Sequence, residues 1–273
     1  MKRTNFFFSK IAVLSGICLI LMCCFIFSYA VYRDKAVPVL MYHGVGTENV
    51  KNWGDMLISP EVFEQQIKYL HDHGYKLVSV EEVSERLKMN KDVKKYIAIT
   101  FDDGYLNNYT YAFPILKKYA ATATFYIIPD AVGSTGYMGG PAKYMGDAEI
   151  KEMLKAGMRI GSHTMSHSDL TLLQEEQYQN ELAESKRLLE QRFGTTVESI
   201  AYPYGSYNEK TVSSVKKYGY MEGVTGNTGV NTKDTYTENP MTIYRIGISN
   251  TIKDIKDFMY RIEYVKLIGF FQK

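Results

Sequence analysis

Short apolar segments rich in β-branched and aromatic residues recur along the chain after residue 36. They are Val37–Tyr42, Leu77–Val80, Tyr96–Phe101, Ala123–Ile128, Met158–Gly161, Ser199–Tyr202, Met221–Thr225 and Thr242–Ile248. Continuous apolar runs of this length are typical of strands that are covered on both faces. We therefore predict a buried strand in each segment.

Helical patterns with recognisable ends lie between most of these strands. The first begins at Ser59-Pro60, where a capping serine precedes a proline, and ends at Gly74. The others run over Asp147–Ala156, Glu175–Phe193, Asn208–Tyr218 and Thr251–Tyr264. Because strand and helix alternate, we expect an α/β fold with a parallel sheet. About eight such units predict a closed or nearly closed barrel, with a doubly wound open sheet as the alternative.

The first 35 residues differ from the rest of the chain. No charged residue occurs from Ile11 to Tyr32, and the preceding flank carries Lys2, Arg3 and Lys10 without an acidic residue. This segment of 22 residues is long enough to span a hydrocarbon core of about 30 Å, and its basic flank should stay in the cytoplasm. We predict a signal peptide or signal anchor over residues 1–35, followed by one extracytoplasmic domain over residues 36–273.

Two interpretations of this segment remain open. Ser28-Tyr29-Ala30 has the small-x-small pattern of a signal-peptidase site, which favours a secreted protein, whereas the segment's length favours an anchor on the outer face of the cytoplasmic membrane. All three cysteines, Cys18, Cys23 and Cys24, lie here. The exported part can therefore form no disulfide bond and no thiolate metal site.

The charge balance excludes one class of partner. The chain has 32 basic and 30 acidic residues, and without residues 1–30 the basic residues number 29 against the same 30 acidic ones. A protein that binds nucleic acid needs an excess of positive charge. We therefore expect no nucleic-acid partner.

Polar residues directly follow four of the predicted strands. They are His43, Asp102-Asp103-Gly104, Ser162-His163 and Pro203-Tyr204-Gly205. In α/β barrels the active site lies at the carboxyl ends of the strands. We therefore expect these side chains to meet at one mouth of the barrel.

The carboxylates and histidines of this group suit a metal ion. Asp102 and Asp103 would repel each other at a buried strand end unless a cation were near, and Gly104 allows the backbone to turn. His163 and His167 are spaced i, i+4, which in one helical turn puts both imidazoles on the same side. Two histidines and one carboxylate form a good divalent-metal set. A solvated turn and a pair of surface histidines are the alternatives.

These residues resemble a known family. Thr100-Phe101-Asp102-Asp103-Gly104, Ser162-His163-Thr164-Met165-Ser166-His167 and Tyr202-Pro203-Tyr204-Gly205, in this order, are similar to the first three motifs of the polysaccharide deacetylases with a NodB-type domain, carbohydrate esterase family 4. The resemblance extends from about Val37 to the last predicted strand and implies a distorted (β/α) barrel.

The resemblance also implies a role for each residue. Asp103, His163 and His167 would bind a divalent metal, usually zinc, and Asp102 would be the catalytic base. Pro203 and Tyr204 would form one wall of an acetate pocket, and the Tyr204 backbone N–H would help to bind the oxyanion.

Two parts of the family's pattern are missing. The arginine that usually opens the third motif and holds the catalytic aspartate is absent, since Ile200-Ala201 precede Tyr202. The later motif with a tryptophan and a Leu-x-His is absent too, because the only tryptophan is Trp53 and no histidine follows His167.

An early histidine is a candidate for the missing acid. Val37–Val45 resembles the opening segment of the branch that deacetylates poly-N-acetylglucosamine, and there His43 would replace the late histidine. A histidine that only caps a strand end is the alternative.

Together these residues predict hydrolysis of an acetamide. Asp102 would take a proton from water that a metal has acidified, and protonated His43 would donate to the departing amine. We expect an exported enzyme that removes N-acetyl groups from an N-acetylglucosamine-containing cell-surface polysaccharide. Aromatic rings near the mouth are expected to cover sugar rings; they belong to Tyr42, Tyr105, Tyr137 and Tyr204. A non-catalytic carbohydrate-binding module of the cell wall and an acetylxylan-type O-deacetylase are the alternatives.

Overall fold

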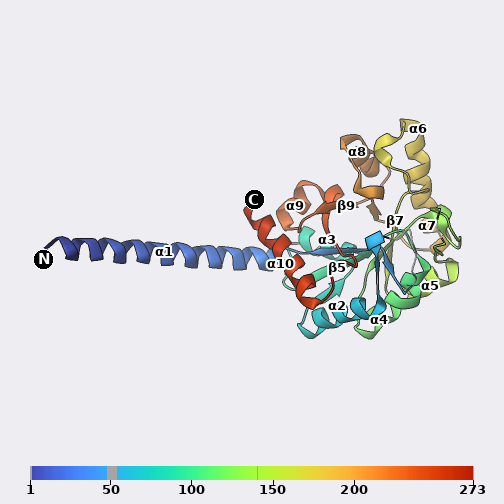
Figure 1. Ribbon diagram of the computed structural model, residues 1–273. Helices are drawn as coiled ribbons and strands as arrows, with labels where there is room; N and C mark the ends of the chain where they lie inside the picture. The colour runs from blue at the N-terminus through green and yellow to red at the C-terminus, as the bar shows by residue number, and fades with distance from the viewer. Residues whose placement is uncertain (1, 48–53, 140, 273) are drawn as a thin grey trace.

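A computed structural model describes residues 2–47, 54–139 and 141–272. Trp53 lies outside these ranges. The body of the domain is a closed barrel of seven parallel strands with helices around it (Figure 1). The strands are β1 (Val39–Tyr42), β5 (Tyr96–Phe101), β6 (Thr124–Ile127), β7 (Arg159–Ser162), β8 (Ser199–Ala201), β9 (Glu222–Thr228) and β10 (Ile243–Gly247). Each pairs in parallel with its neighbours, and β1 closes the ring by pairing with both β10 and β5.

All the predicted strands form, but one of them lies beside the ring. β4 (Lys76–Val78) pairs with the first half of β5, where Val78 is aligned with Ala98. β1 lies along the opposite edge of β5, where Val39 is aligned with Ala98 and Tyr42 with Phe101. The predicted barrel is thus confirmed. A further parallel pair that the pattern does not predict consists of β2 (Gly44–Val45) and β3 (Leu57–Ile58).

Apolar and aromatic side chains fill the layer between the barrel strands and the helices outside them. Phe101 of β5 stacks on Phe125 of β6 with ring centroids 4.7 Å apart, and Tyr42 of β1 lies 5.4 Å from Phe101. All three are fully buried. Tyr42 also meets Phe63 of the helix over residues 60–72 edge-on at 5.2 Å, so burial of these aromatic surfaces stabilises the packing of that helix on the barrel.

Helices cover the outside of the barrel. They are α2 (Pro60–Asp72), α3 (Val80–Lys88), α4 (Phe113–Lys118), α5 (Asp147–Lys155), α6 (Glu175–Tyr178), α7 (Ser185–Phe193), α8 (Glu209–Lys217), α9 (Lys233–Glu238) and α10 (Ile255–Phe271). Short 3-10 or π turns connect them: η1 (Gly54–Met56), η2 (Asn108–Ala112), η3 (Pro129–Ala131), η4 (Leu170–Leu172), η5 (Gln179–Glu184), η6 (Pro203–Gly205) and η7 (Pro240–Thr242).

The predicted helix ends are confirmed with one exception. The Ser59 side chain accepts a hydrogen bond from the Val62 N–H at 3.3 Å and caps α2, as predicted. The last helix, however, begins at Ile255 rather than Thr251 and continues beyond Tyr264 to Phe271. Its cap is Asp254, whose side chain accepts from the Asp257 N–H at 2.9 Å.

The N-terminal apolar segment forms one long helix, α1 (Lys2–Lys35), which projects away from the barrel (Figure 1). Its part from Ser15 to Lys35 is long and apolar enough to cross a membrane. A signal sequence near an N-terminus has the same properties. The predicted apolar helix is therefore confirmed, whereas its cleavage remains a prediction.

Candidate active site

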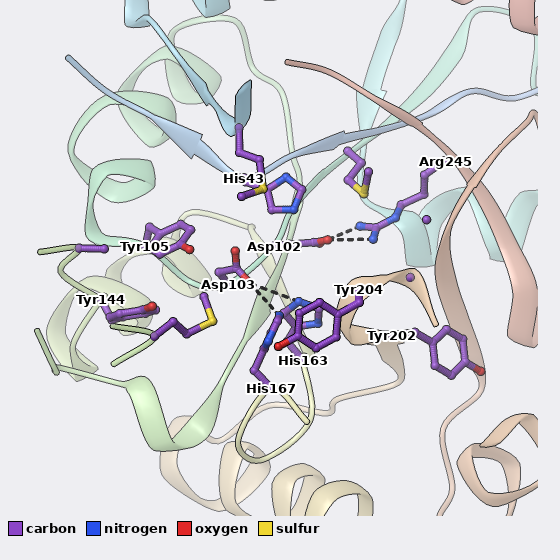
Figure 2. Close-up of a pocket in the computed structure, with 16 residues that line it drawn as sticks. His43, Asp102, Asp103, Tyr105, Tyr144, His163, His167, Tyr202, Tyr204 and Arg245 are labelled. Atoms are coloured by element: carbon purple, nitrogen blue, oxygen red, sulfur yellow. Dashed lines mark hydrogen bonds and ion pairs between the residues drawn. The ribbon is translucent and has the colours of Figure 1, made fainter. Parts of the chain in front are cut away.

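A cavity of about 580 Å³ opens at the carboxyl ends of the barrel strands (Figure 2). It brings together residues from six strand ends and loops, and its carboxylate, imidazole and guanidinium groups belong to His43, Asp102, Asp103, His163, His167 and Arg245. The predicted meeting of polar side chains at one mouth is thus what the structure shows. The cavity also contains a cation, Arg245, that the sequence motifs do not include.

Asp102 and Asp103 diverge although they are adjacent. Both Asp103 and Gly104 have left-handed backbone conformations, with φ of 72° and 76°. This conformation is unfavourable for a residue with a Cβ atom, so the surrounding fold must impose it at Asp103. As a result, the Asp102 carboxylate faces Arg245 and the Asp103 carboxylate faces the two histidines (Figure 2).

The Asp102 carboxylate is held by a bidentate ion pair. Arg245 on β10 donates from Nη1 to Oδ1 at 2.7 Å and from Nη2 to Oδ2 at 2.8 Å, and both side chains are buried. Burial alone would raise the pKa of Asp102, but the charge of Arg245, the charge of His163 and the hydrogen bonds from Arg245 together outweigh it, and the pKa lies below its usual value. Asp102 is therefore ionised at neutral pH.

Asp103, His163 and His167 form a compact set of potential metal ligands. Asp103 Oδ1 lies 3.3 Å from His163 Nε2 and 3.4 Å from His167 Nε2, and one ligand atom from each residue falls within 4.8 Å of the others. The other ring nitrogen of His163, Nδ1, lies 2.8 Å from the Ala201 carbonyl oxygen. Because a carbonyl oxygen can only accept, Nδ1 carries a proton, and Nε2 is the ring nitrogen that faces Asp103 and is placed to serve as a metal ligand.

The backbone between the two histidines is a turn, so the predicted helical turn is wrong. Thr164 and His167 both have left-handed conformations, with φ of 60° and 63°. The Met165 N–H and the Ser166 N–H are bonded to the carbonyl and the carboxylate of Glu181 instead of to a preceding helical turn. The imidazoles still approach each other, with ring centroids 4.7 Å apart, because the turn folds both toward Asp103.

The protonation states of this set follow from burial and mutual charge. Burial would raise the pKa of Asp103, but the hydrogen bond and charge of His163 lower it well below its usual range. Burial would lower the pKa of His163, yet the bond to Asp103 and the nearby carboxylates raise it. Burial and then the charge of His163 lower the pKa of His167 to about 4. The site thus offers an ionised carboxylate and a neutral imidazole, both of which a cation binds well.

Comparison with known proteins decides the family. Residues 89–223 match the family model described as polysaccharide deacetylase. The Bacillus subtilis protein YxkH is 35% identical over 218 residues, which cover 80% of this chain and 73% of YxkH. The poly-beta-1,6-N-acetyl-D-glucosamine N-deacetylase of Staphylococcus aureus is 30% identical over 215 residues, covering 70% of this chain and 72% of that protein.

The chain belongs to the polysaccharide deacetylase family. A solved structure supports the same assignment. The Streptococcus pyogenes deacetylase PplD in complex with acetate superimposes with a TM-score of 0.73 at 31% identity, over 83% of this chain and 97% of PplD.

Arg245 holds Asp102 and so takes the place of the arginine that is absent from the third motif of this polysaccharide deacetylase. It reaches Asp102 from a strand that lies 143 residues away in the sequence. Its Nε also donates to the Thr225 carbonyl oxygen at 2.8 Å, which fixes the guanidinium plane. The sequence held one indication of this residue, since Arg245 is the single charge inside the apolar segment Thr242–Ile248.

His43 projects into the cavity from the loop after β1, on the side of Asp102 and Asp103 (Figure 2). Its backbone is held by buried Asn108, which donates to the His43 carbonyl oxygen at 2.7 Å and accepts from the Val45 N–H at 3.2 Å. The ring is partly exposed. The position agrees with the expected acid, and the catalytic role remains a prediction.

The predicted aromatic contacts differ in their placement. Tyr204 has a left-handed backbone with φ of 60°, is 73% exposed and lies edge-on to His167 with centroids 4.8 Å apart. Pro203 is buried beneath it and does not line the cavity, so its predicted role as a wall is not supported by direct contact. Tyr105 lines the cavity but is only 7% exposed, because it bonds to Asp103 and packs on Tyr144 with centroids 5.1 Å apart.

The other two predicted rim tyrosines lie further away. Tyr42 is fully buried and donates to Gln66 Oε1 at 2.9 Å, so its predicted place on the rim is wrong. Its side chain points into the core because the strand register places the next residue, His43, at the mouth. Tyr137 is partly buried and packs edge-on against Tyr144.

Proposed function

We propose that this protein is an exported, metal-dependent hydrolase that removes N-acetyl groups from an N-acetylglucosamine-containing cell-surface polysaccharide. The observation that carries the proposal is the divergence of Asp102 and Asp103. One carboxylate is held ionised by Arg245, and the other lies between two imidazoles within the same cavity. A base and a cation site are thereby adjacent but separate.

The metal fits the side chains present. Two imidazole nitrogens and one carboxylate oxygen are the donor set that zinc prefers, and three protein ligands leave positions for water and substrate. Asp103, His163 and His167 would hold the ion. When bound, a divalent metal of this kind supplies acidified water and polarises a carbonyl oxygen.

The protein's own groups then move the protons. Asp102, ionised and fixed by Arg245, accepts a proton from the attacking water. His43, which lines the same cavity, would donate a proton to the amine as the amide bond breaks. The Tyr204 backbone N–H would stabilise the charge that develops on the carbonyl oxygen. The products are acetate and a free amino sugar.

The substrate class is supported by the relatives and by the shape of the site. The similar Staphylococcus aureus enzyme is named for poly-beta-1,6-N-acetyl-D-glucosamine, and the similar PplD structure contains acetate. The exposed Tyr204 ring provides a flat face beside the proposed metal ligands, which suits stacking on a sugar ring.

Acetate release tests this proposal directly. The metal-loaded protein would be incubated with poly-β-1,6-N-acetylglucosamine, chitin oligomers, peptidoglycan and acetylxylan. Release from an N-acetylated polymer, abolished by a chelator, supports the proposal. Preferential release from acetylxylan would make the protein an O-deacetylase, and tight polymer binding without any release would make it a binding module.

We further propose that α1 is retained as an anchor. The helix continues without a break through Ser28-Tyr29-Ala30 to Lys35, and Tyr29, which cleavage after Ala30 would remove, packs against the domain core and on Phe270 with ring centroids 5.6 Å apart. Intact α1 therefore contributes to the fold. Mass spectrometry of the protein from the membrane fraction tests this, and a soluble form that begins at Val31 would show cleavage instead.

A further inference from the structure

The last helix, α10, carries an exposed apolar stripe. Tyr260, Tyr264, Leu267, Ile268 and Phe271 are exposed by 69%, 48%, 37%, 37% and 67%. Their i, i+4, i+7, i+8 and i+11 spacing places them along one side of the helix. A continuous apolar face of this kind on an otherwise polar surface marks an interaction site.

Aromatic contacts join the end of this stripe to α1. Phe25 stacks on Phe271 with centroids 5.9 Å apart and meets Phe270 edge-on at 5.7 Å. Tyr29 and Tyr32 also pack on Phe270, at 5.6 and 5.5 Å. In Figure 1 the end of α10 lies beside α1, at the point where α1 leaves the domain.

The junction is fixed by close packing. A Cβ atom at Gly269 would lie 2.6 Å from the Tyr32 hydroxyl, so the two helices approach as closely as they do only because residue 269 is glycine. Tyr32 itself is 7% exposed. The depth of α1 in a membrane therefore determines the depth of the end of α10.

Helix geometry gives that depth. Phe25 belongs to the uncharged run Ile11–Tyr32, and it precedes Arg33, the first charge after this run, by eight residues. At 1.5 Å per residue this is about 12 Å. Half of a hydrocarbon core is about 15 Å thick. With Arg33 at the lipid headgroups, Phe25 lies well inside the hydrocarbon, and Phe271, stacked on it, lies there too.

We propose that the exposed stripe of α10 is a second membrane contact, immersed in the outer leaflet beside α1. This inference rests on the proposed retention of α1. The order of residues along the stripe agrees with it, since Tyr260 and Tyr264 would lie toward the headgroups and Leu267, Ile268 and Phe271 in the hydrocarbon. Tyrosine is enriched at that interface because its ring is apolar and its hydroxyl polar.

The two contacts together orient the domain. Only residues 36–38 separate α1 from β1, so the membrane lies at the amino ends of the barrel strands (Figure 1). The cavity opens at their carboxyl ends. The site therefore points away from the membrane, which suits a polymer outside the cell more than a substrate held at the bilayer surface.

Fluorescence quenching by brominated lipid tests the contact. The full chain with Trp53→Phe serves as a background without tryptophan, and a reporter is introduced by Phe271→Trp. Matched controls are Leu19→Trp in α1, 56% exposed, and Leu172→Trp in η4, 78% exposed. Each protein is reconstituted into vesicles of phosphatidylcholine and phosphatidylglycerol, with the phosphatidylcholine brominated on its acyl chains or left unmodified.

We expect brominated lipid to reduce emission about twofold or more for Phe271→Trp and Leu19→Trp, whose reporters would lie at hydrocarbon depth, and to leave Leu172→Trp unchanged. Quenching for Leu19→Trp alone would overturn the second contact while leaving the anchor in place. If neither reporter is quenched, both the second contact and the anchor are contradicted.

Ile268→Trp repeats the test with a reporter that does not alter the Phe25 stack. An unquenched stripe together with a crosslinked dimer would assign this face to a second copy of the chain. The measurement requires no turnover, so it is independent of the proposed activity.

Discussion

The guanidinium of Arg245 and the carboxylate of Asp102 form two parallel hydrogen bonds of 2.7 and 2.8 Å inside the barrel. This pairing fixes both the charge and the direction of the carboxylate. Because a charge-assisted bidentate pair is stronger and more directional than a single bond, Asp102 is held in the orientation in which it faces the cavity. Arg245 is therefore a positioning residue, and its effect on the reaction passes through Asp102.

Replacement of this arginine should change the pH profile. In Arg245→Lys one charge remains but the bidentate geometry is lost, so the pKa of Asp102 should rise toward its usual value. We expect kcat to fall about 10–100-fold, the equivalent of the 1.5–3 kcal/mol of a charged hydrogen bond, and the acidic limb of kcat/KM to move to higher pH. Bound metal should be unchanged. The matched control is Arg159→Lys on the exposed end of β7. An unshifted acidic limb would contradict the assignment of Asp102 as the base.

Substitution of the proposed ligands should separate metal binding from proton transfer. Asp103→Ala, His163→Ala and His167→Ala should each lower metal content and acetate release together. Asp102→Asn keeps the shape of the side chain and should retain the metal while turnover falls about 10²–10⁴-fold. Metal content by atomic emission and acetate release are measured on the same samples. Any ligand variant that keeps its full metal content would remove that residue from the site.

The proposed role of His43 as the catalytic acid is tested by comparing two substrates whose leaving groups differ in their need for a proton. His43→Ala should lower kcat for an acetamide about 10²–10⁴-fold without loss of metal, because the amine must be protonated as it departs. An activated aryl acetate needs little such help and should be affected much less. Exposed His71 on α2 provides the control His71→Ala. Equal losses on both substrates would assign His43 to a structural role at the end of β1.

A conservative change at Tyr105 tests whether its hydroxyl strengthens metal binding through Asp103 or contacts the substrate. Its hydroxyl donates to Asp103, and burial, followed by that carboxylate, raises its pKa. Tyr105→Phe removes only this donor and should weaken metal affinity about 10–100-fold, as expected for a partner of a metal ligand. Tyr109 lies outside the cavity and its hydroxyl donates to Glu152 Oε2 at 2.7 Å, so Tyr109→Phe provides the control. A higher KM with unchanged metal affinity would instead return Tyr105 to the sugar-binding role that the sequence suggested.

A carboxyl group outside the site should make stability depend on pH. Glu222 of β9 is 3% exposed and accepts a hydrogen bond from Ser84, and burial, together with Glu81 and Glu198, raises its pKa well above the usual value. A raised native pKa contributes stability that is complete below the unfolded value of about 4.3 and is lost as the pH rises through the native value. Glu222→Gln should thus match the parent in acid and exceed it at pH 8 by about 1–3 kcal/mol, the cost of leaving a buried polar group poorly satisfied.

Chemical denaturation at several pH values measures this difference. The exposed Glu238 of α9 provides the control Glu238→Gln, which should follow the parent at every pH. Parallel curves for Glu222→Gln and the parent would show that the Glu222 carboxyl group has the same pKa in the folded and unfolded chain.

Local patterns in the sequence were enough to predict the elements of this fold. The apolar runs mark every strand of the barrel, because a strand covered on both faces needs apolar residues throughout. Ser59-Pro60 marks the start of α2, because a cap depends only on residues within one turn. The residue types at the strand ends also predicted that aspartates and histidines meet at one mouth, since the carboxyl ends of parallel strands must meet, and the family resemblance singled out Asp103, His163 and His167 among them.

Contacts between distant segments were decided only by the tertiary structure. Arg245 reaches Asp102 because the ring closes through β1 and β10, and no local pattern encodes which strand will face which carboxylate. The turn at Thr164 and His167 depends on Glu181 from a later segment, so the histidine spacing alone suggested the wrong backbone. Tyr42 is in the core, and the end of α10 packs on α1 through the rings of Phe270 and Phe25. Each of these features depends on packing between residues far apart in the chain, whereas strands, caps and motif residues depend on neighbours within a few positions.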